Sequence, residues 1–272
     1  VYKRQGDTLG RIRSQVDFLD VGQGLSVLLT TRNYQLLYDT GPGNGLDGDA
    51  GLDMVTGTIQ PMISATGQQP DLIVASHADL DHAGGLARLQ SIYPGASFLA
   101  CLPVSRAGIR PCSAPGSWTN DGLVFRILHP SASLPYLGND SSCVISVTGV
   151  GLSILLSGDI SHAVEQRLVD EGLVQHAILS VPHHGSSTSS SQVLIEAVRP
   201  AWALISAANA NRFGFPRIEV LERYAKNHVP TLDTARCGGI RITSGSMGEI
   251  GISSARVSDR AIWRWPAIDH CP

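Results

Sequence analysis

Short hydrophobic runs separated by turn residues organise the first part of the chain. The run at 72–75 is wholly apolar, which predicts a strand covered on both faces. Hydrophobic residues at helical spacing predict one helix before this strand, at 53–65, and another after it, at 83–93. Three earlier runs predict a meander of strands or hairpins, at 16–21, 26–30 and 35–39.

The second part of the chain repeats this alternation of strands and helices. Ser161 begins one predicted helix, Ser190 or Ser191 a second that runs to Pro200, and Pro216 a third. Strands are predicted at 123–128, 143–147, 153–156, 177–181 and 203–205, with short strands again after 239. Two successive β-rich halves with interspersed helices predict an α/β fold with two sheets packed face to face and helices outside, a four-layer αββα sandwich. With no linker between the halves, we expect a single domain over 1–272.

Composition narrows the class of protein. The 272 residues are 43% hydrophobic with a net charge of −3, which excludes global disorder and any overall positive field for nucleic acid. No apolar run is long enough to span a bilayer, and the start lacks both a signal-like core and Met, which suggests a piece excised from a longer chain. The five cysteines fit either two disulfides or free buried thiols.

The strongest chemical signal lies directly after the predicted strand at 72–75. His77, Asp79, Asp81 and His82 place two imidazoles and two carboxylates within six residues, at the start of a predicted helix. A helix cap needs one acidic residue, whereas four such side chains together are typical of a metal site. We therefore expect these residues to hold a divalent cation.

Two further signals also follow predicted strands. His183 and His184 come after 177–181, and Asp159 comes after 153–156. Taken alone, the paired histidines would more often be surface residues, and Asp159 would more often belong to a turn or helix cap. Because an α/β fold gathers ligand groups at the carboxyl ends of its strands, the three signals together favour one site.

The chain resembles the metallo-β-lactamase superfamily, whose hallmark is HxHxDH followed by a histidine, an aspartate and a final histidine. Within it, the chain resembles the C-terminal hydrolase domain of the ComEC/Rec2 competence proteins, which take up DNA during transformation. The elements that carry the resemblance lie at 20–24, 38–42, 76–85, 112, 118, 121–122, 139–142, 157–159 and 182–186.

The resemblance implies a centre with two divalent metal ions. It places His77 and Asp79 on the first ion, Asp81 and His82 on the second, and Asp159 between them. The final histidine, His184 or its neighbour His183, completes the second site, and Asp39 orients the metal-binding loop through a hydrogen bond. Asn139 stands where the superfamily has its downstream histidine, and Asp79 stands where it has the second histidine of the HxHxDH motif. Because these oxygen donors favour harder ions, Mn²⁺ becomes as plausible as Zn²⁺.

The implied activity is hydrolysis of DNA phosphodiesters, which degrades the non-transforming strand during uptake. Asp81, Asp159 and His183 are the predicted catalytic residues, and two metal ions would activate water for attack on phosphorus. The predicted substrate contacts are His183, Ser186, Asn211 and Arg212. Arg212 begins a stretch rich in arginine, and Phe213 and Phe215 beside it offer rings for stacking on bases. A solvated basic face, and a simple helix cap at Ser186, remain alternatives.

The resemblance also implies partners and location. The expected partners are DNA, the transmembrane channel portion of the same parent protein and other DNA-uptake proteins. The expected location is the periplasmic or extracellular face of the cytoplasmic membrane. Two other functions stay open: a metallohydrolase of small esters, of the phosphorylcholine esterase or lactonase type, and a non-catalytic domain that guides DNA.

Overall fold

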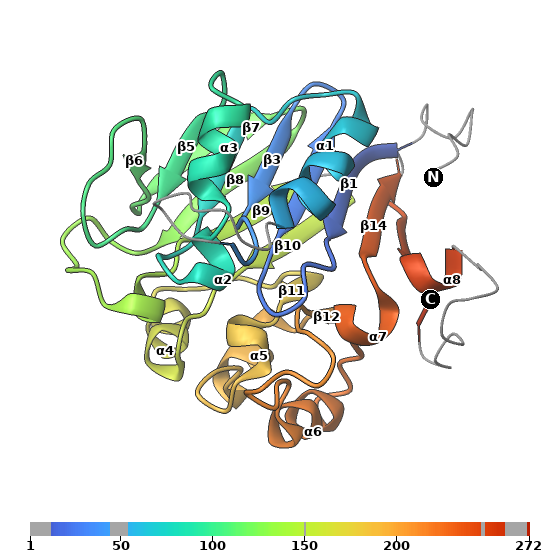
Figure 1. Ribbon diagram of the computed structural model, residues 1–272. Coiled ribbons are helices and arrows are strands. Elements are labelled where there is room, and N and C mark those ends of the chain that lie inside the picture. The colour runs from blue at the N-terminus through green and yellow to red at the C-terminus, as the bar shows by residue number, and fades with distance from the viewer. Residues whose placement is uncertain (1–11, 44–53, 150, 246–247, 259–270) are drawn as a thin grey trace.

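Two β-sheets face each other in the computed structural model, which describes residues 12–43, 54–149, 151–245, 248–258 and 271–272 (Figure 1). The first sheet has the strand order β15-β14-β1-β2-β3-β4-β5-β6 in the described residues. Its strands are β1 (Ile12–Phe18), β2 (Val27–Thr31), β3 (Gln35–Tyr38), β4 (Leu72–Ala75), β5 (Ser97–Ala100), β6 (Arg110–Pro111), β14 (Ile240–Gly245) and β15 (Ile250–Ser254). Neighbours from β3 to β6 pair in parallel, and the others are antiparallel.

The second sheet has the order β13-β12-β11-β10-β9-β8-β7. Its strands are β7 (Gly116–Asn120), β8 (Leu123–His129), β9 (Val144–Gly149), β10 (Leu152–Leu156), β11 (Ile178–Ser180), β12 (Trp202–Ile205) and β13 (Thr231–Asp233). The strands from β10 to β13 run parallel, so their carboxyl ends meet at one edge. That edge carries the loops that hold Asp159 and His184.

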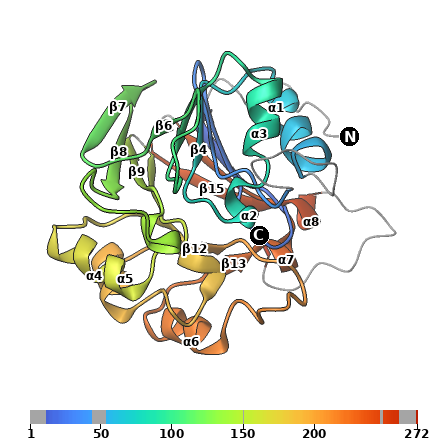
Figure 2. The same cartoon turned by 60° about the vertical axis from the view of Figure 1, so that its left-hand side comes forward.

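Helices cover the outer face of each sheet (Figure 2). The first sheet is covered by η1 (Val55–Ile59), α1 (Gln60–Thr66), α2 (Leu80–Ala83) and α3 (Leu86–Ile92). The second is covered by α4 (His162–Asp170), α5 (Gln192–Val198) and α6 (Ile218–Lys226). The remaining short helices are η2 (Gly138–Ser141), η3 (Pro182–Gly185), α7 (Thr234–Cys237) and α8 (Ala255–Ser258).

Three apolar clusters give the molecule its layers. The central cluster joins the inner faces of the sheets, with Phe18 and Leu36 from the first packed together with Phe125 and Ile154 from the second. The outer clusters join each sheet to its helices. The four-layer αββα sandwich expected from the sequence is therefore present.

Some predicted elements differ in extent. The strand expected at 16–21 ends at Phe18. The helix expected at 83–93 corresponds to α3, and the short helix α2 precedes it. Position 53, where a helix was expected to begin, lies outside the described residues, and helical structure is described from Met54 onward. No helix in the described ranges is both long and apolar enough to cross a membrane.

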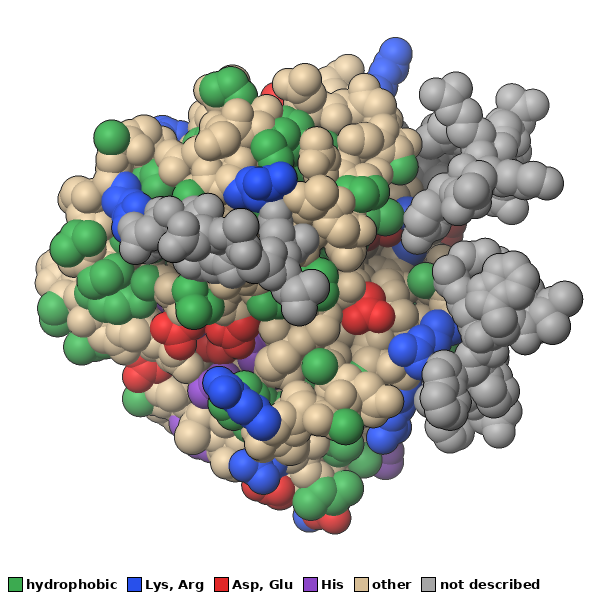
Figure 3. Space-filling view, viewed as in Figure 1, with side chains coloured by type: hydrophobic (Ala, Val, Ile, Leu, Met, Phe, Trp, Pro, Cys, Tyr) green, Lys and Arg blue, Asp and Glu red, His purple; other side chains and the backbone are tan. Residues whose placement is uncertain are grey.

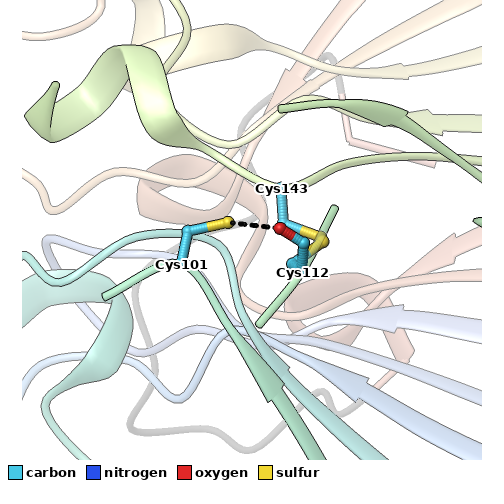
Figure 4. Close-up of side chains that lie close together, drawn as sticks. All are labelled: Cys101, Cys112 and Cys143. Carbon is cyan, nitrogen blue, oxygen red and sulfur yellow. Dashed lines mark hydrogen bonds between the residues drawn. A yellow bond between two sulfur atoms is a disulfide. The ribbon is translucent and has the colours of Figure 1, made fainter. Parts of the chain in front are cut away.

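Disulfides join distant parts of the chain. Cys112, directly after β6, is bonded to Cys143, directly before β9, so this bridge links the two sheets. Cys237 in α7 is bonded to Cys271. Cys101 is a buried free thiol whose Sγ lies 3.6 Å from the Cys112 carbonyl oxygen (Figure 4). The sequence left two disulfides or free buried thiols as alternatives. The structure has two disulfides, and the fifth cysteine is a free buried thiol.

Candidate metal centre

The predicted ligand residues come from the carboxyl ends of strands in both sheets. His77 follows β4, Asp159 follows β10 and His184 follows β11, while Asp81 and His82 lie in the first turn after β4. On the face in Figure 3, acidic side chains and histidines adjoin one another close to a group of basic side chains. The strand ends of the two sheets therefore bring together side chains that lie more than 100 residues apart in the sequence.

Two overlapping groups of donor atoms form this centre. One consists of His77, His82 and Asp159, and the other of Asp81, His82 and His184; within each, the ligand atoms lie within 4.8 Å of one another. His82 belongs to both. Asp159 also reaches both, because its Oδ1 lies 3.2 Å from His82 Nε2 and its Oδ2 lies 3.6 Å from His184 Nε2.

Hydrogen bonds on the far side of two imidazoles turn their Nε2 atoms toward this point. His184 donates from Nδ1 to the Ser206 carbonyl at 2.7 Å, and His82 Nδ1 lies 2.7 Å from the Asp39 carboxylate. The two Nε2 atoms then face each other at 3.1 Å. Fixing Nδ1 as the donor leaves Nε2 to ligate, which is how proteins prepare histidines for metals.

His77 provides the test of whether a cation fits. Its Nε2 is buried and has no hydrogen-bond partner, although Nδ1 lies 3.0 Å from Ser76 Oγ. Leaving a buried polar nitrogen unpaired costs about 1–3 kcal/mol, and a divalent ion between His77, His82 and Asp159 would remove that cost. The residues present therefore fit a metal ion.

The electrostatics of the centre point the same way. Burial alone would lower the pKa of His82, yet the carboxylates of Asp159 and Asp39 raise that pKa well above its usual value. Burial alone would raise the pKa of Asp159, but His82 and His184 hold it well below the usual range. The surroundings thus stabilise positive charge at the point where the donor atoms converge.

The backbone here adopts conformations that most residues avoid. His183 and His184 have φ values of 51° and 53°, followed by Gly185 at 82°. Before Asp159, Gly158 has φ of 56°, and a Cβ there would lie 2.7 Å from the Ser142 Cβ. Such strain persists only where packing imposes it, and it concentrates at functional sites.

Three predicted ligands occupy the rim of the centre. Asp79 has a 55% exposed side chain, with Oδ2 3.7 Å from His77 Nε2, and is in neither donor group. Asn139 lies 3.3 Å from His183 Nε2. His183, 24% exposed, is 3.8 Å from Asp159, so it faces the open side while His184 faces the donor atoms. Of the two neighbouring histidines, the geometry favours His184 as a ligand.

The predicted substrate residues are placed unequally. Phe213 and Phe215 stack with centroids 5.5 Å apart, and Phe215 meets the His183 ring edge-on at 5.6 Å. Arg212 lies over Phe213 at 4.6 Å. Asn211 instead braces its own loop through bonds to Ala208 and Phe215. Ser186 is buried and contacts Thr188, so its hydroxyl does not face the open side.

The structure adds positioning residues that sequence reasoning did not single out. Ser142 donates to the Asn139 carbonyl, accepts from the Asp159 amide and lies 3.4 Å from His77 Nδ1. Tyr136 accepts a hydrogen bond from the Ala78 amide at 3.0 Å. Ser142 belongs to the stretch 139–142 noted in the sequence, whereas nothing in the sequence marks Tyr136.

Comparisons with known proteins decide the family. Residues 19–100 match the family model described as the metallo-beta-lactamase superfamily. The chain is 35% identical to Recombination protein 2 of Haemophilus influenzae over 84% of this chain and 28% of that protein. It is 34% identical to Competence protein ComA of Neisseria gonorrhoeae over 88% of this chain and 33% of that protein.

The chain belongs to the metallo-beta-lactamase superfamily. It is homologous to the C-terminal part of those competence and recombination proteins and spans about a third of their length. A solved superfamily structure, YhfI from Bacillus subtilis, agrees in fold with a TM-score of 0.53 at 12% identity, covering 89% of this chain and all of that one. The family resemblance and the fold class expected from the sequence are both confirmed.

Proposed function

We propose that this superfamily domain is a metal-dependent nuclease that hydrolyses DNA phosphodiesters during DNA uptake. One observation carries the proposal: two donor groups that share His82 lie beside an aromatic and cationic surface formed by Phe213, Phe215 and Arg212. Donor groups that adjoin in this way suit a pair of ions, and stacked aromatics with arginine suit single-stranded nucleic acid.

The residues divide into roles by position. His77, His82, Asp159, Asp81 and His184 would hold two divalent cations, with Asp79 and Asn139 closing the first site from the rim. Such ions supply an activated water and positive charge for an in-line displacement at phosphorus. Asp39 holds His82 in the orientation that ligation needs.

His183 is the histidine placed to meet the substrate. Its ring faces the open side, between the Asp159 carboxylate and the Phe215 ring. A phosphate entering there comes within reach of an imidazole nitrogen, while a neighbouring base stacks on Phe213 or Phe215. Arg212 and Arg217, which lie over these two rings, add cationic charge beside the phosphates.

The wider setting is proposed on the same grounds. The two relatives described above are named for recombination and competence, and the chain matches about a third of each. We infer that residues 1–272 act as one domain of a larger membrane protein whose channel portion and DNA-uptake partners handle the strand. Two disulfides suit an oxidising location, so we place the domain at the periplasmic or extracellular face of the cytoplasmic membrane.

A single experiment separates this proposal from its alternatives. The chain is stripped with a chelator, reloaded with Mn²⁺ or Zn²⁺, and given labelled single-stranded DNA or a small ester such as 4-nitrophenyl phosphorylcholine or a lactone. Cleavage of DNA supports the nuclease. Cleavage of the small ester alone supports the esterase or lactonase type, and binding of DNA without cleavage under either ion supports a guiding domain. Reactivation of DNA cleavage by Zn²⁺ and never by Mn²⁺ would exclude a role for manganese.

A further inference from the structure

A second feature adjoins the metal centre. A cavity of about 220 Å³ lies between the loop after β5 and the loop that precedes η2, and both residues of β6 line it. Its walls combine apolar side chains, Leu102, Val104 and Ile109, with the guanidinium groups of Arg106 and Arg110. All of its lining residues belong to the described part of the chain, and none of them is acidic.

The cavity shares a wall with the metal-binding loop. Tyr136 lines the cavity, and its hydroxyl accepts a hydrogen bond from the backbone amide of Ala78, which stands between His77 and Asp79. Ser141 also lines the cavity and directly precedes Ser142, whose hydroxyl bonds the Asp159 amide. Tyr136 and Ser141 therefore connect the cavity wall with the segments that carry His77, Asp79 and Asp159.

Covalent and hydrogen-bonded links fix the shape of the cavity. Cys112 lines it and is bonded to Cys143, which follows Ser142 and donates from its amide to the Ser76 carbonyl at 2.8 Å. Figure 4 shows how the Cys101 side chain lies against this disulfide from the end of β5. Because the walls are tied together before any ligand arrives, little ordering is needed on binding.

The chemistry of the lining selects the ligand class. Apolar walls suit a flat base and sugar, and the exposed guanidinium of Arg110 suits a phosphate. The cavity is smaller than the roughly 300–1,000 Å³ of pockets for drug-sized ligands, so it suits one unit rather than a folded strand. The stacked phenylalanines adjoin His183, whereas this cavity adjoins Ala78, so the two features serve different positions along a substrate.

We propose that this cavity binds one nucleotide of the substrate strand, next to the phosphodiester that is cleaved. The proposal rests on the proposed nuclease function and adds a determinant of substrate choice to it. The base and sugar pack on Leu102, Val104 and Ile109, and Arg110 contacts the phosphate that follows. Tyr136 transmits the position of that nucleotide to the loop that carries His77 and Asp79.

Two variants test the cavity. R110Q removes an exposed positive charge from its wall, and S105W places a large ring into it from an exposed loop position. R126Q, an exposed arginine on β8 that does not line the cavity, is the matched control. Each chain is assayed on a fluorescent single-stranded oligonucleotide and on methyl 4-nitrophenyl phosphate, a phosphodiester that carries no nucleoside. Binding of the same oligonucleotide is measured by fluorescence anisotropy, with and without metal.

We expect the ratio of kcat/KM for the oligonucleotide to that for the small diester to fall about tenfold in R110Q and S105W, equivalent to about 1.4 kcal/mol. The oligonucleotide Kd rises by a similar factor, and R126Q matches the parent chain in both readouts. An unchanged ratio and an unchanged Kd in both variants would overturn the subsite. A parent chain that cleaves neither substrate would instead refute the nuclease, and the anisotropy result would then judge the cavity by itself.

Discussion

His82 and Asp39 form a fully buried pair in which the imidazole Nδ1 lies 2.7 Å from the carboxylate Oδ2. Asp39 also accepts hydrogen bonds from the Ser76 amide and hydroxyl, immediately before His77. One carboxylate therefore sets the orientation of a proposed ligand and the position of the loop that carries another. It acts on the metal centre without belonging to either donor group.

Replacing Asp39 with asparagine is expected to weaken metal binding about 10- to 100-fold, because the amide cannot hold the His82 ring in the same protonation state. The measurement is competition with a chelating dye for Mn²⁺ or Zn²⁺. D71N is the matched control, since Asp71 accepts from the Gln35 amide at the opposite end of β3. Equal affinities in D39N and the parent chain would show that Asp39 only supports the fold.

Metal binding is expected to stabilise the stripped chain. A ligand at 100 times its Kd adds about 2.7 kcal/mol, which corresponds to a rise of about 5–10 °C in Tm for a chain of this size. The stabilisation should be large here because the ion gives the unpaired His77 Nε2 atom a partner. Differential scanning fluorimetry with added Mn²⁺ or Zn²⁺ measures it.

The variant H184A tests where that stabilisation arises. It removes the imidazole that faces His82 and Asp81, so the metal-dependent rise in Tm should shrink strongly. H183A leaves both donor groups intact and should keep most of the rise. If H183A rather than H184A abolished it, the assignment of the two neighbours would have to be exchanged.

Phe213 offers a direct test of the nucleic-acid surface. Its ring is 38% exposed and stacks on Phe215, so F213A should weaken binding of a single-stranded oligonucleotide about tenfold, within the roughly 1–3 kcal/mol that a stacked base contributes. V174A, another exposed hydrophobic position, is the control. Affinity should also fall steeply as salt rises if the arginines contact phosphates. A flat salt response would contradict the role of the basic surface.

Cys101 is expected to resist alkylation in the folded chain. Burial raises the pKa of its thiol to about 12, so hardly any thiolate is present at pH 8. An unfolded chain ionises this thiol from about pH 9, so the stability that the neutral thiol contributes is complete below pH 9 and declines as pH rises toward 12. Iodoacetamide labelling with and without guanidinium, read by mass spectrometry, measures the protection. The variant C101S identifies the labelled site. Equal labelling of the folded and unfolded chains would refute the predicted protection of Cys101.

The parts of the fold that sequence predicts well are those decided by local pattern. The apolar run of β4 and the cluster from His77 to His82 lie within a dozen residues, so strand, turn and donor groups could be predicted together. The helices α4 and α5 carry their own start signals at the N-caps Ser161 and Ser191, whereas α6 begins two residues after the predicted start at Pro216, with Arg217 as its N-cap. Such features depend on neighbours in the chain rather than on the assembled core.

Contacts between distant segments could not be predicted in this way. β7 is a half-exposed strand that pairs along β8, and Thr231–Asp233 becomes a strand because it meets β12. The pairing of Cys112 with Cys143 requires the two sheets to be in place. The contact between Tyr136 and Ala78 joins residues 58 positions apart, and only the packed loops bring the hydroxyl to that amide.

Glu165 holds the loop that follows the two neighbouring histidines, and its removal should loosen that loop. This carboxylate is completely buried in α4 and accepts hydrogen bonds from the Ser190 and Ser191 amides at 2.6 and 2.8 Å. E165A leaves both amides without their acceptor, so the free energy of unfolding should fall by about 1–3 kcal/mol or more. E196A, an exposed glutamate on α5, should change it by less than about 0.5 kcal/mol. Urea denaturation compares the three chains, and hydrogen exchange at 186–191 tests whether the loss is local. Because the strained His183–His184 backbone directly precedes this loop, metal affinity should fall in E165A as well. A loss of stability with unchanged hydrogen exchange and unchanged metal affinity would show that Glu165 stabilises the helix alone.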